Sequence, residues 1–425
     1  MHPSTDRPDL LVVSSELPWP LNTGGHLRTY HLLRALASRC RVRLVTVVER
    51  ADDPGLAVLE GHGIAVIPAV CGPRHKVREG LRAVRAALQG EPYVMFHRHN
   101  RGPLRNALRR ALALRSPEVV YLDHLDPLAF RTMLPRVPLV ADLHNVYSTL
   151  AARVAEERTW PLRVYLQREA SLLAAMERRV AATADLLLTV SSQEKAVFEG
   201  LGARAVQLVP NGVDCAAFEK FATGREHAEP VVLYLGALSW QPNAAAADFL
   251  ARRVMPELRA KHPNARLLVV GRQPGPEVLS LAALPGVEVH ADVPEIGPYL
   301  ERASLLAVPL DSGGGTRLKI LEAFAAGLPV VSTAVGAEGI DARHDEHLLL
   351  AERDRFAAML LEAFADPART TRLAAAARAL ARAQYDWPMV GARACDAVLG
   401  LVRPGDRIGH VHAGAAQRQH RLDVR

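Results

Sequence analysis

The sequence predicts an α/β protein with two Rossmann-like βαβ domains that face each other across a cleft. Short β-branched runs alternate with longer helical stretches, the runs fall into two series, and a polar segment containing glycine and proline separates the series. Nearly continuous apolar strands between helices indicate parallel sheets that are covered on both faces. The 425 residues suffice for two or three domains with their own cores, at about 150 residues per domain.

The strand candidates follow the chain in order. The first series of apolar runs comprises residues 10–14, 42–48, 64–67, 119–122, 139–142, 186–190 and 206–209. The second series comprises residues 231–236, 266–271, 286–290, 305–309 and 329–332. Between the first two runs, residues 25–39 are predicted to be helical because Leu27, Tyr30, Leu33 and Ala37 recur at helical spacing.

Composition sets the predicted domain boundaries. Residues 1–218 form the first domain, and the polar segment at residues 219–230 is a linker. The second domain spans residues 231–380, and a helix at residues 381–402 is expected to pack back on the first domain. Residues 403–425 are polar and lack periodicity, which predicts a flexible tail. Ligands of two such domains are expected near the carboxyl ends of the strands.

The overall composition excludes several classes of protein. With 49% hydrophobic and 23% charged residues, the chain is neither disordered nor collagen-like nor a disulfide-rich miniprotein. No uncharged apolar run approaches the roughly 18 residues that span a bilayer, and the N-terminal segment lacks the features of a signal peptide. The four cysteines lie far apart and match no metal-ligand spacing, so we expect reduced thiols and a cytoplasmic location.

Positive charge is concentrated in one segment of the first domain. From Arg74 to Arg115 there are eleven Arg and Lys residues and two acidic ones, an excess that is larger than the net charge of +7 of the whole chain. This excess favours an anionic partner, either a membrane surface or a nucleic acid, while a solvated helix face is an equally weighted alternative. Because no nucleic-acid-binding motif accompanies it, we expect no nucleic acid partner and a peripheral position on the inner face of the cytoplasmic membrane.

The first strand-to-helix turn contains two adjacent glycines. Gly24 and Gly25 open the helix that follows the strand at residues 10–14. Glycines there let a ligand approach the backbone closely, and a helix N-terminus favours an anion. A glycine turn that serves only helix packing is the alternative, and the GxGxxG fingerprint of dinucleotide-binding proteins is missing.

A second strand-to-helix turn, DSGGGTRLKILEAF, follows the strand at residues 305–309. Gly313, Gly314, Gly315 and Thr316 precede the helix, and their backbone amides, together with the Thr316 hydroxyl, can bind a phosphate. Arg317 and Lys319 add positive charge, and Glu322 shares a helix face with Lys319. A carboxylate beside a phosphate site suits ribose hydroxyls. The alternative is a glycine loop with a surface pair of Lys319 and Glu322.

An ordered set of segments resembles one known family. The segments are PWPLNTGGHLRTYHLLRALA, DLHNVYS, ADLLLTVSSQEKAVF, VPNGVD, LYLGALSWQPN, ARLLVVGRQP, GVEVHADVPEIGPYLERASLLAVPL and GGGTRLKILEAFAAGLPVVSTAVGAEGI. Together they cover about residues 10–400, and they resemble the retaining, sugar-nucleotide-dependent glycosyltransferases of family 4, which have the GT-B fold. The similarity is greatest to bacterial members that act in exopolysaccharide or cell-surface glycan assembly.

The resemblance assigns donor-binding residues to the second domain. Glu322 matches the second glutamate of the E-x7-E motif, which binds the nucleotide ribose, whereas Gly314 stands where the first glutamate contacts the donor sugar. The loop backbone or Asp311 is then expected to contact the sugar, and Arg272 is a further donor-side candidate. The family places an Arg and a Lys after Gly236 to hold the diphosphate, but this chain has ALSWQPN there. We therefore expect Arg317 and Lys319 to supply that charge as catalytic groups.

The resemblance also places a histidine near the donor sugar in the first domain. The segment VVYLDHLDP offers Asp123 and His124, and DLHN offers His144 and Asn145. We expect His124 to be catalytic and Asp123, His144 and Asn145 to lie on the acceptor side, with a structural role as the alternative for each histidine.

The expected activity follows from the resemblance. It implies a retaining glycosyltransferase that moves a sugar from a nucleoside-diphosphate sugar to a hydroxyl of a saccharide, lipid-linked or small-molecule acceptor. No metal or other cofactor is expected. A non-hydrolysing sugar-nucleotide epimerase and a non-catalytic sugar-nucleotide-binding subunit are the alternatives, since both would share the two-domain architecture.

Overall fold

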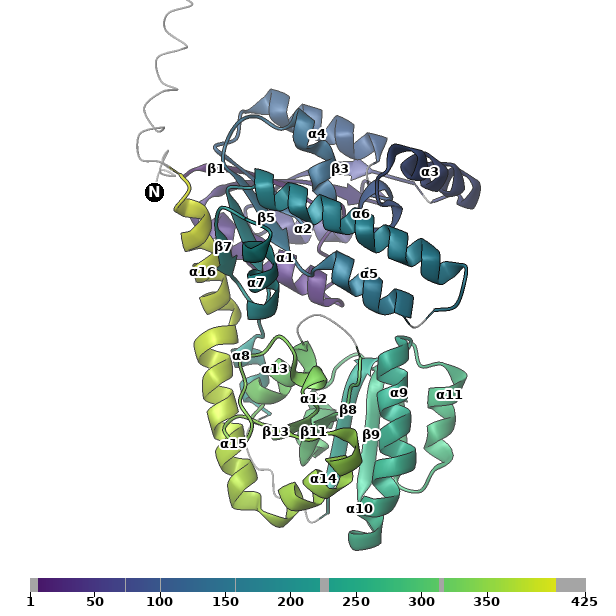
Figure 1. The fold of residues 1–425 in the computed structure, drawn as a ribbon. Helices are drawn as coiled ribbons and strands as arrows, with labels where there is room; N and C mark the ends of the chain where they lie inside the picture. Colours follow the sequence, from purple (N-terminus) through teal and green to yellow (C-terminus); the bar gives the residue numbers. More distant parts are fainter. Residues whose placement is uncertain are drawn as a thin grey trace, which may run out of the picture. The chain divides into compact units, whose positions relative to one another are not determined.

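The computed structural model describes residues 7–72, 74–99, 101–156, 158–221, 229–312 and 317–402, which form two compact units (Figure 1). In the described part of the chain, the first unit contains residues 7–189 and 194–209 and continues from Gly391 to residue 402. The second unit contains residues 190–193 and 210–390.

The first unit is built on a seven-stranded parallel sheet in the order β3-β2-β1-β4-β5-β6-β7. Its strands are β1 (Asp9–Val13), β2 (Arg41–Val48), β3 (Ala65–Val70), β4 (Val119–Asp123), β5 (Leu139–Leu143), β6 (Leu186–Thr189) and β7 (Val206–Leu208). The accompanying helices are α1 (Gly24–Arg39), α2 (Pro54–Glu60), α3 (Lys76–Gln89), α4 (Gly102–Leu114), α5 (Tyr147–Glu156), α6 (Leu162–Thr183) and α7 (Ser192–Gly200), with a π-helical turn η1 (Tyr93–His97) and a 3-10 helix η2 (Asp126–Met133).

The second unit is built on a six-stranded parallel sheet in the order β10-β9-β8-β11-β12-β13. Its strands are β8 (Val231–Ala237), β9 (Arg266–Arg272), β10 (Val287–Ala291), β11 (Leu305–Val308), β12 (Val330–Ser332) and β13 (Leu349–Leu350). Its helices are α8 (Cys215–Glu219), α9 (Gln241–Phe249), α10 (Met255–Lys261), α11 (Pro276–Leu279), α12 (Gly297–Arg302), α13 (Leu318–Ala325), α14 (Phe356–Ala365) and α15 (Pro367–Leu380), followed by α16 (Trp387–Leu399).

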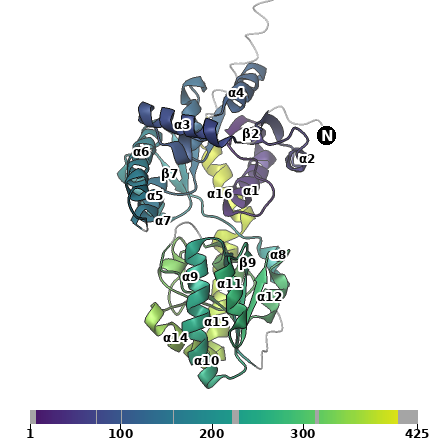
Figure 2. The same ribbon diagram turned by 90° about the vertical axis from the view of Figure 1, so that its right-hand side faces the viewer.

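The predicted strands are confirmed, and one was missed. All twelve predicted runs are strands within a few residues of the expected bounds, because buried apolar runs of this length fit a sheet that helices cover on both faces (Figure 1, Figure 2). Strand β13 has only two residues, which is too short to produce a periodic pattern. Neither sheet contains an antiparallel pair among the described strands.

The boundary between the units lies earlier in the chain than predicted. The second unit starts at Pro210 rather than after a linker at residues 219–230. Val213 and Cys215 are buried in the core of the second unit, and the Phe221 ring lies against Gly297 of α12. These apolar contacts, rather than the polar composition, decide where the second unit begins, whereas residues 222–228 of the predicted linker are outside the described part of the chain.

The C-terminal helix returns to the first unit, as expected. A π-helical turn η7 (Ala381–Tyr385) precedes α16, and from Gly391 onwards the chain belongs to the first unit. There Gly391 packs against Ala35 of α1, and Asp396 forms an ion pair with Arg39 at 2.5 Å. The predicted tail at residues 403–425 lies outside the described residues. None of the helices that the structure describes has both the length and the apolarity to cross a bilayer.

The strand order locates the candidate ligand sites. In each sheet the chain reverses its direction of strand addition beside the first strand, between β1 and β4 and between β8 and β11. Ligands of open α/β sheets bind outside the carboxyl ends of the strands at such switch points. The ends of these four strands are therefore where functional side chains are expected.

Candidate functional site

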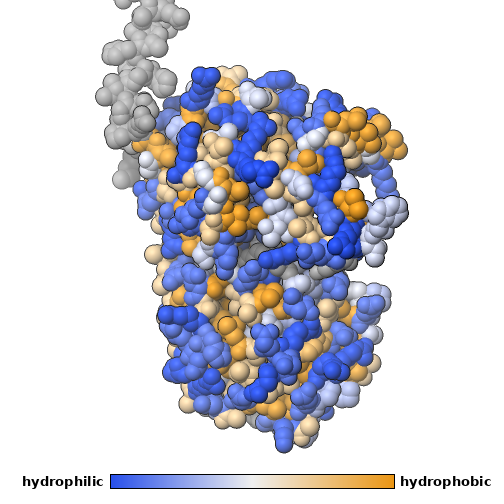
Figure 3. Space-filling model, in the orientation of Figure 1, coloured by the Kyte–Doolittle hydropathy of each residue, from blue (hydrophilic) through white to orange (hydrophobic). Residues whose placement is uncertain are grey.

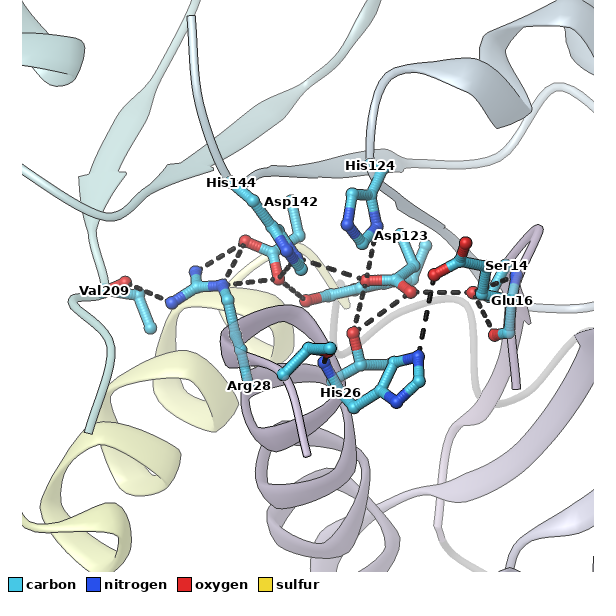
Figure 4. Close-up of polar contacts among 12 residues, drawn as sticks. Ser14, Glu16, His26, Arg28, Asp123, His124, Asp142, His144 and Val209 are labelled. Carbon is cyan, nitrogen blue, oxygen red and sulfur yellow. Dashed lines mark hydrogen bonds and ion pairs between the residues drawn. The ribbon is translucent and has the colours of Figure 1, made fainter. Parts of the chain in front are cut away.

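In the first unit, polar side chains gather at the carboxyl ends of β1, β4 and β5 (Figure 4). Ser14 follows β1, Asp123 is the last residue of β4, His124 follows it, and His144 follows β5. Parallel strands place their carboxyl ends at one edge, so residues from distant parts of the chain meet there. The structure thereby brings together Asp123, His124 and His144, while their predicted roles stay predictions.

Asp123 is the centre of this cluster. Its carboxylate accepts hydrogen bonds from Ser14 Oγ at 2.7 Å and Thr29 Oγ1 at 2.9 Å. It also lies 3.5 Å from His124 Nδ1 and 3.3 Å from His144 Nε2. Burial alone would raise the pKa of Asp123, but His124 and the other nearby donors hold it well below its ordinary value. Asp123 is therefore an anion that the fold has already paired.

His124 is held in a conformation that few residues adopt. Its φ angle is 75°, in the left-handed region, and its backbone N–H donates to the carbonyl oxygen of Asp142 at 3.0 Å. Backbone strain of this kind concentrates at functional sites. Burial alone would lower the pKa of His124, but the adjacent Asp123 carboxylate raises it to about 9. At neutral pH the ring is therefore a cation, and its centroid lies 3.7 Å from that of His144.

The glycine turn lies beside the histidines. A Cβ atom on Gly25 would lie 3.7 Å from His124 Nε2 and 3.8 Å from His144 Nδ1. Thr23 caps helix α1 by accepting from the His26 backbone N–H at 3.2 Å. The N-terminal amides of α1 and the His124 cation thus create positive potential in one place, which suits an anionic group.

A buried ion pair beneath the cluster was not predicted. The guanidinium of Arg28 contacts Asp142 with Nε at 3.0 Å and Nη2 at 2.5 Å, and both side chains are fully buried. Tyr121 also donates to Asp142 at 2.9 Å, and Arg28 Nη1 donates to the carbonyl oxygen of Val209 at 2.7 Å. Burial would raise the pKa of Asp142, but Arg28 outweighs it and holds the pKa far below its ordinary range. The only sign of this pair in the sequence is that Asp142, a charged residue, lies near the end of an apolar strand.

Two further titratable groups border the cluster. The Glu16 carboxylate and the His26 ring lie close together, with His26 Nε2 3.6 Å from Glu16 Oε2, and this contact lowers the pKa of Glu16 and raises the pKa of His26. Burial raises the pKa of Asp126 to about 7. Asn145, which we expected on the acceptor side, is half-buried beside His144.

The cluster also has the spacing of a metal site. One ligand atom from each of Asp123, His124 and His144 lies within 4.8 Å of the others. A metal ion would have to displace the proton of His124, whose pKa is about 9, and this competition weakens metal binding at neutral pH. That the chain needs no metal stays a prediction.

In the second unit, Lys319 of α13 lies near the carboxyl end of β8. Lys319 Nζ donates to Asn243 Oδ1 at 3.1 Å and lies 4.6 Å from the centroid of the Tyr234 ring. Tyr234 donates to the same Oδ1 at 2.9 Å, and Asn243 Nδ2 donates to the carbonyl oxygen of Ala237 at 3.0 Å. The ammonium group is thus held by neutral groups. None of the described residues forms an ion pair with Lys319.

Gly236 makes this arrangement possible. A Cβ atom there would lie 3.1 Å from Lys319 Nζ and 2.9 Å from Asn243 Cγ, which is closer than side chains normally tolerate. Sequence comparison alone showed only that the expected Arg and Lys after Gly236 were missing. The structure shows that Asn243, a residue of this divergent segment, contacts the lysine that α13 contributes.

Burial shifts the pKa values of Lys319 and Glu322 in the second cluster towards their neutral forms. Burial, followed by the nearby Arg317 guanidinium, lowers the pKa of Lys319 from 10.5 to about 7. Burial raises the pKa of Glu322 from 4.5 to about 7, against the opposing effect of Lys319. The Arg317 side chain is also buried, with Nη2 donating to the carbonyl oxygen of Val335 at 3.4 Å. An anion bound here would stabilise the protonated form of Lys319.

The remaining predicted donor-side residues differ in their placement. Gly313, Gly314, Gly315 and Thr316 lie outside the described part of the chain. Arg272 ends β9, is exposed, and lies in register with Ala237 at the same edge of the sheet. Asp311, the alternative contact for the donor sugar, forms an ion pair with Arg353, so its carboxylate is already engaged.

Comparison with known proteins matches both units. Residues 23–217 match a family model described as Glycosyltransferase Family 4, and residues 229–366 match one described as Glycosyl transferases group 1. The glycogen synthase of Mycobacterium tuberculosis is 27% identical over 94% of this chain and 96% of its own length. A GDP-mannose-dependent α-(1-6)-phosphatidylinositol monomannoside mannosyltransferase of the same species is 27% identical over 69% of this chain and 78% of its own length.

Solved structures show the same fold at low sequence identity. The Anabaena HepE protein in complex with UDP-glucose is 17% identical, with a TM-score of 0.64 over 93% of this chain and all of the other. Sucrose-phosphate synthase from Thermosynechococcus elongatus is 19% identical, with a TM-score of 0.65 over 91% of this chain and 97% of the other. Neither alternative function receives support from these comparisons. The chain is a glycosyltransferase with the GT-B fold, and the matches of its two units are consistent with a member of glycosyltransferase family 4.

Proposed function

We propose that this glycosyltransferase transfers a sugar, with retention of its anomeric configuration, from a nucleoside-diphosphate sugar to an acceptor hydroxyl. The observation that carries the proposal is the cluster of the second unit, where Arg317 is buried and the half-buried Lys319 has no ion-pair partner among the described residues. A diphosphate supplies the negative charge that such a site lacks. The relatives support this donor class, since one is named for its dependence on GDP-mannose and HepE was solved with UDP-glucose.

The proposed chemistry needs stabilisation of the leaving group. As the bond between the sugar and the diphosphate breaks, negative charge grows on the phosphate oxygens, and preorganised cations lower the energy of that state. Lys319 and Arg317 perform this role without a metal ion. Glu322, one turn along α13, accepts hydrogen bonds from the ribose hydroxyls, which favours its ionised form.

The first unit contributes two paired carboxylates and a histidine cation. Asp123 and Asp142 are both paired within the cluster, so neither carboxylate is available as a nucleophile on the sugar. This agrees with retention by attack of the acceptor hydroxyl on the same face that the diphosphate leaves. In this proposal the His124 cation and the Gly24 and Gly25 amides contact anionic or hydroxyl groups of the substrates, and His144 and Asn145 lie on the acceptor side.

The decisive experiment has two parts. A thermal-shift panel of nucleoside diphosphates and their sugars should identify a donor that raises the melting temperature, because a ligand that binds only the folded state stabilises it. NMR of the product formed from that donor should then show the anomeric configuration of the donor. Full donor turnover in an Arg317→Ala/Lys319→Ala variant would refute the roles of these cations, and an inverted product would refute retention.

For the acceptor, we propose a saccharide or lipid-linked hydroxyl compound and a peripheral position on the inner leaflet of the cytoplasmic membrane. The support is the positive segment between Arg74 and Arg115, whose excess charge attracts anionic lipid headgroups. Transfer to a lipid-linked acceptor in anionic vesicles should exceed transfer to the same acceptor in neutral vesicles. Equal rates in both would contradict this part of the proposal.

A further inference from the structure

Helix α3 turns its apolar side outwards. The fractional exposures of Val77, Leu81, Val84 and Leu88 are 78%, 67%, 59% and 85%. At 100° per residue these four side chains fall within about 60° of one another around the helix axis, so they form one stripe. A helix on a globular protein normally buries such a stripe, so its full exposure requires an explanation.

The opposite side of α3 is fixed by polar contacts. Glu79 accepts from the Tyr93 hydroxyl at 2.6 Å and from Arg82 at 2.9 Å, and Arg82 also donates to the carbonyl oxygen of His97 at 2.7 Å. Ala86, on this side, is the one α3 residue that is fully buried. These contacts set the rotation of the helix about its axis, and the apolar stripe faces outwards as a result.

Basic side chains flank the stripe. Lys76, Arg78 and Arg85 of α3 are exposed, and by helical spacing Arg78 and Arg85 border one edge of the stripe while Lys76 borders the other. The exposed Arg105, Arg109 and Arg110 of α4 extend the positive surface of the same unit. An apolar stripe between basic edges matches the interface of an anionic bilayer, where acyl chains lie beneath negative headgroups.

A second exposed apolar group lies at the start of α6. Trp160, which is 79% exposed, precedes the exposed Leu162, Val164 and Tyr165. Arg168 of α6 donates to the carbonyl oxygen of Ala87 at 2.9 Å, which joins α6 to the C-terminal end of α3. Apolar surface accordingly appears at the α3 end of the first unit (Figure 3). Tryptophan and tyrosine are the residues that favour the boundary between headgroups and acyl chains.

We propose that α3 lies in the interface of an anionic membrane leaflet, with Val77, Leu81, Val84 and Leu88 inserted among the acyl chains. Lys76, Arg78 and Arg85 contact headgroup phosphates, and Trp160 anchors the adjacent end of α6. A second copy of this chain is a poorer occupant because two surfaces of like positive charge repel each other. A nucleic acid would satisfy the basic edges but leave the apolar stripe in water. The inference rests on the membrane attraction proposed above and not on the transfer chemistry.

The test uses the full chain, vesicles of phosphatidylcholine with or without phosphatidylglycerol, and no donor. A variant with Val77→Ser, Leu81→Ser, Val84→Ser and Leu88→Ser keeps every charge. Its matched control, Val197→Ser/Leu279→Ser, removes exposed apolar side chains elsewhere. Flotation should show binding of the wild type and the control to anionic vesicles. The four-serine variant should bind about a hundredfold more weakly, since withdrawing one aliphatic side chain from water is worth on the order of tenfold and insertion is partial.

Several outcomes would overturn the inference. Wild type that fails to bind anionic vesicles at low salt, or a four-serine variant that binds as the wild type does, would each do so. Gel filtration that shows an oligomer of the wild type and a monomer of the variant would assign the stripe to a second copy instead. Thermal shifts with the donor should be equal for the wild type and the variant. A loss of vesicle binding with an unchanged donor shift therefore separates this inference from the proposed transfer activity.

Discussion

The two units place charged groups at equivalent edges of their sheets but satisfy them in opposite ways. In the first unit, Arg28 and Asp142 neutralise each other in a fully buried pair, and Asp123 receives hydrogen bonds from Ser14 and Thr29. In the second unit, the half-buried Lys319 lies against the neutral groups of Asn243 and Tyr234. The buried Arg28–Asp142 pair is neutralised within the chain, whereas we propose that a ligand supplies the negative charge that Lys319 lacks.

This difference predicts that the Arg28–Asp142 pair serves stability, whereas Lys319 serves donor binding. A buried ion pair stabilises the native state only while both partners are present. A partly buried cation that forms no ion pair costs stability, and such groups occur where a substrate provides the missing charge. Removing charge should therefore weaken the first unit and stabilise the second.

The largest effect is expected for Arg28→Met. It leaves the carboxylate of Asp142 buried without its cation, which should lower the free energy of unfolding by about 3–5 kcal/mol. Urea denaturation measures this loss. The double variant Arg28→Met/Asp142→Leu should recover part of it because no uncompensated charge remains. Arg252→Ala, which breaks an exposed pair with Asp248, should change the unfolding transition far less. A single variant as stable as the wild type would remove the basis of the comparison.

Lys319→Met should have the opposite effect on stability from Arg28→Met and should lower activity. Donor turnover should fall by about 10²–10³-fold, the range for losing one preorganised charge at a developing anion. Stability should rise, by about 1 kcal/mol, because methionine fills a similar volume without a partly buried charge. Steady-state kinetics and urea denaturation of the same preparation check both. Loss of activity together with loss of stability would mean that Lys319 is a structural residue.

The sequence predicted the parts of both units that depend on local pattern. Apolar runs gave the strands. The family resemblance singled out Asp123, His124 and His144, and the structure places them at the carboxyl ends of neighbouring parallel strands. Arg28 could not be found in this way, since its partner Asp142 is 114 residues away and a helical arginine is normally exposed. Asn243 was noticed only as a departure from the family, because its contact with Lys319 spans 76 residues. The periodicity of apolar residues in α3 also does not predict that its apolar side is exposed to solvent.

Donor affinity should depend on pH through Lys319 and Glu322 of the second unit. Lys319 must be protonated to bind a diphosphate, and its pKa of about 7 means that affinity falls as pH rises above 7. Glu322 must be ionised to accept ribose hydroxyls, and its pKa of about 7 means that affinity falls as pH drops below 7. Calorimetric titration with the nucleoside diphosphate from pH 5.5 to 9 should therefore show a maximum near pH 7, with limbs of at most about tenfold per pH unit.

Two variants separate these limbs. In Lys319→Met, donor affinity should still rise from acid to neutral pH but no longer fall at alkaline pH. In Glu322→Gln, affinity should still fall at alkaline pH but no longer decrease at acid pH. A profile that is unchanged in both variants would transfer the pH dependence to other groups, such as His124 in the first unit.

Asn243→Asp converts the neutral support of Lys319 into the kind of pair that the first unit contains. The carboxylate would lie at the position of Asn243 Oδ1, 3.1 Å from Lys319 Nζ, and would compete with the diphosphate for the ammonium group. We expect nucleoside diphosphate to bind about tenfold more weakly, with the alkaline limb moved to higher pH because the new charge raises the pKa of Lys319. Tyr234→Phe, which removes only the hydroxyl bond to Asn243, should change affinity less. Tighter binding by Asn243→Asp would show that the neutral support has no role.

The smallest effect on stability is expected for Gly25→Ala in the first unit. The added Cβ would meet the rings of His124 and His144 at 3.7 and 3.8 Å, which is ordinary contact, and alanine favours a helix over glycine by up to about 1 kcal/mol. The free energy of unfolding should therefore stay level or rise slightly. The methyl group would nevertheless occupy the space next to the α1 amides and the His124 cation. A lower kcat/KM at unchanged stability would show that a substrate approaches this surface closely, and an unchanged kcat/KM would mean that the glycine pair serves helix packing alone.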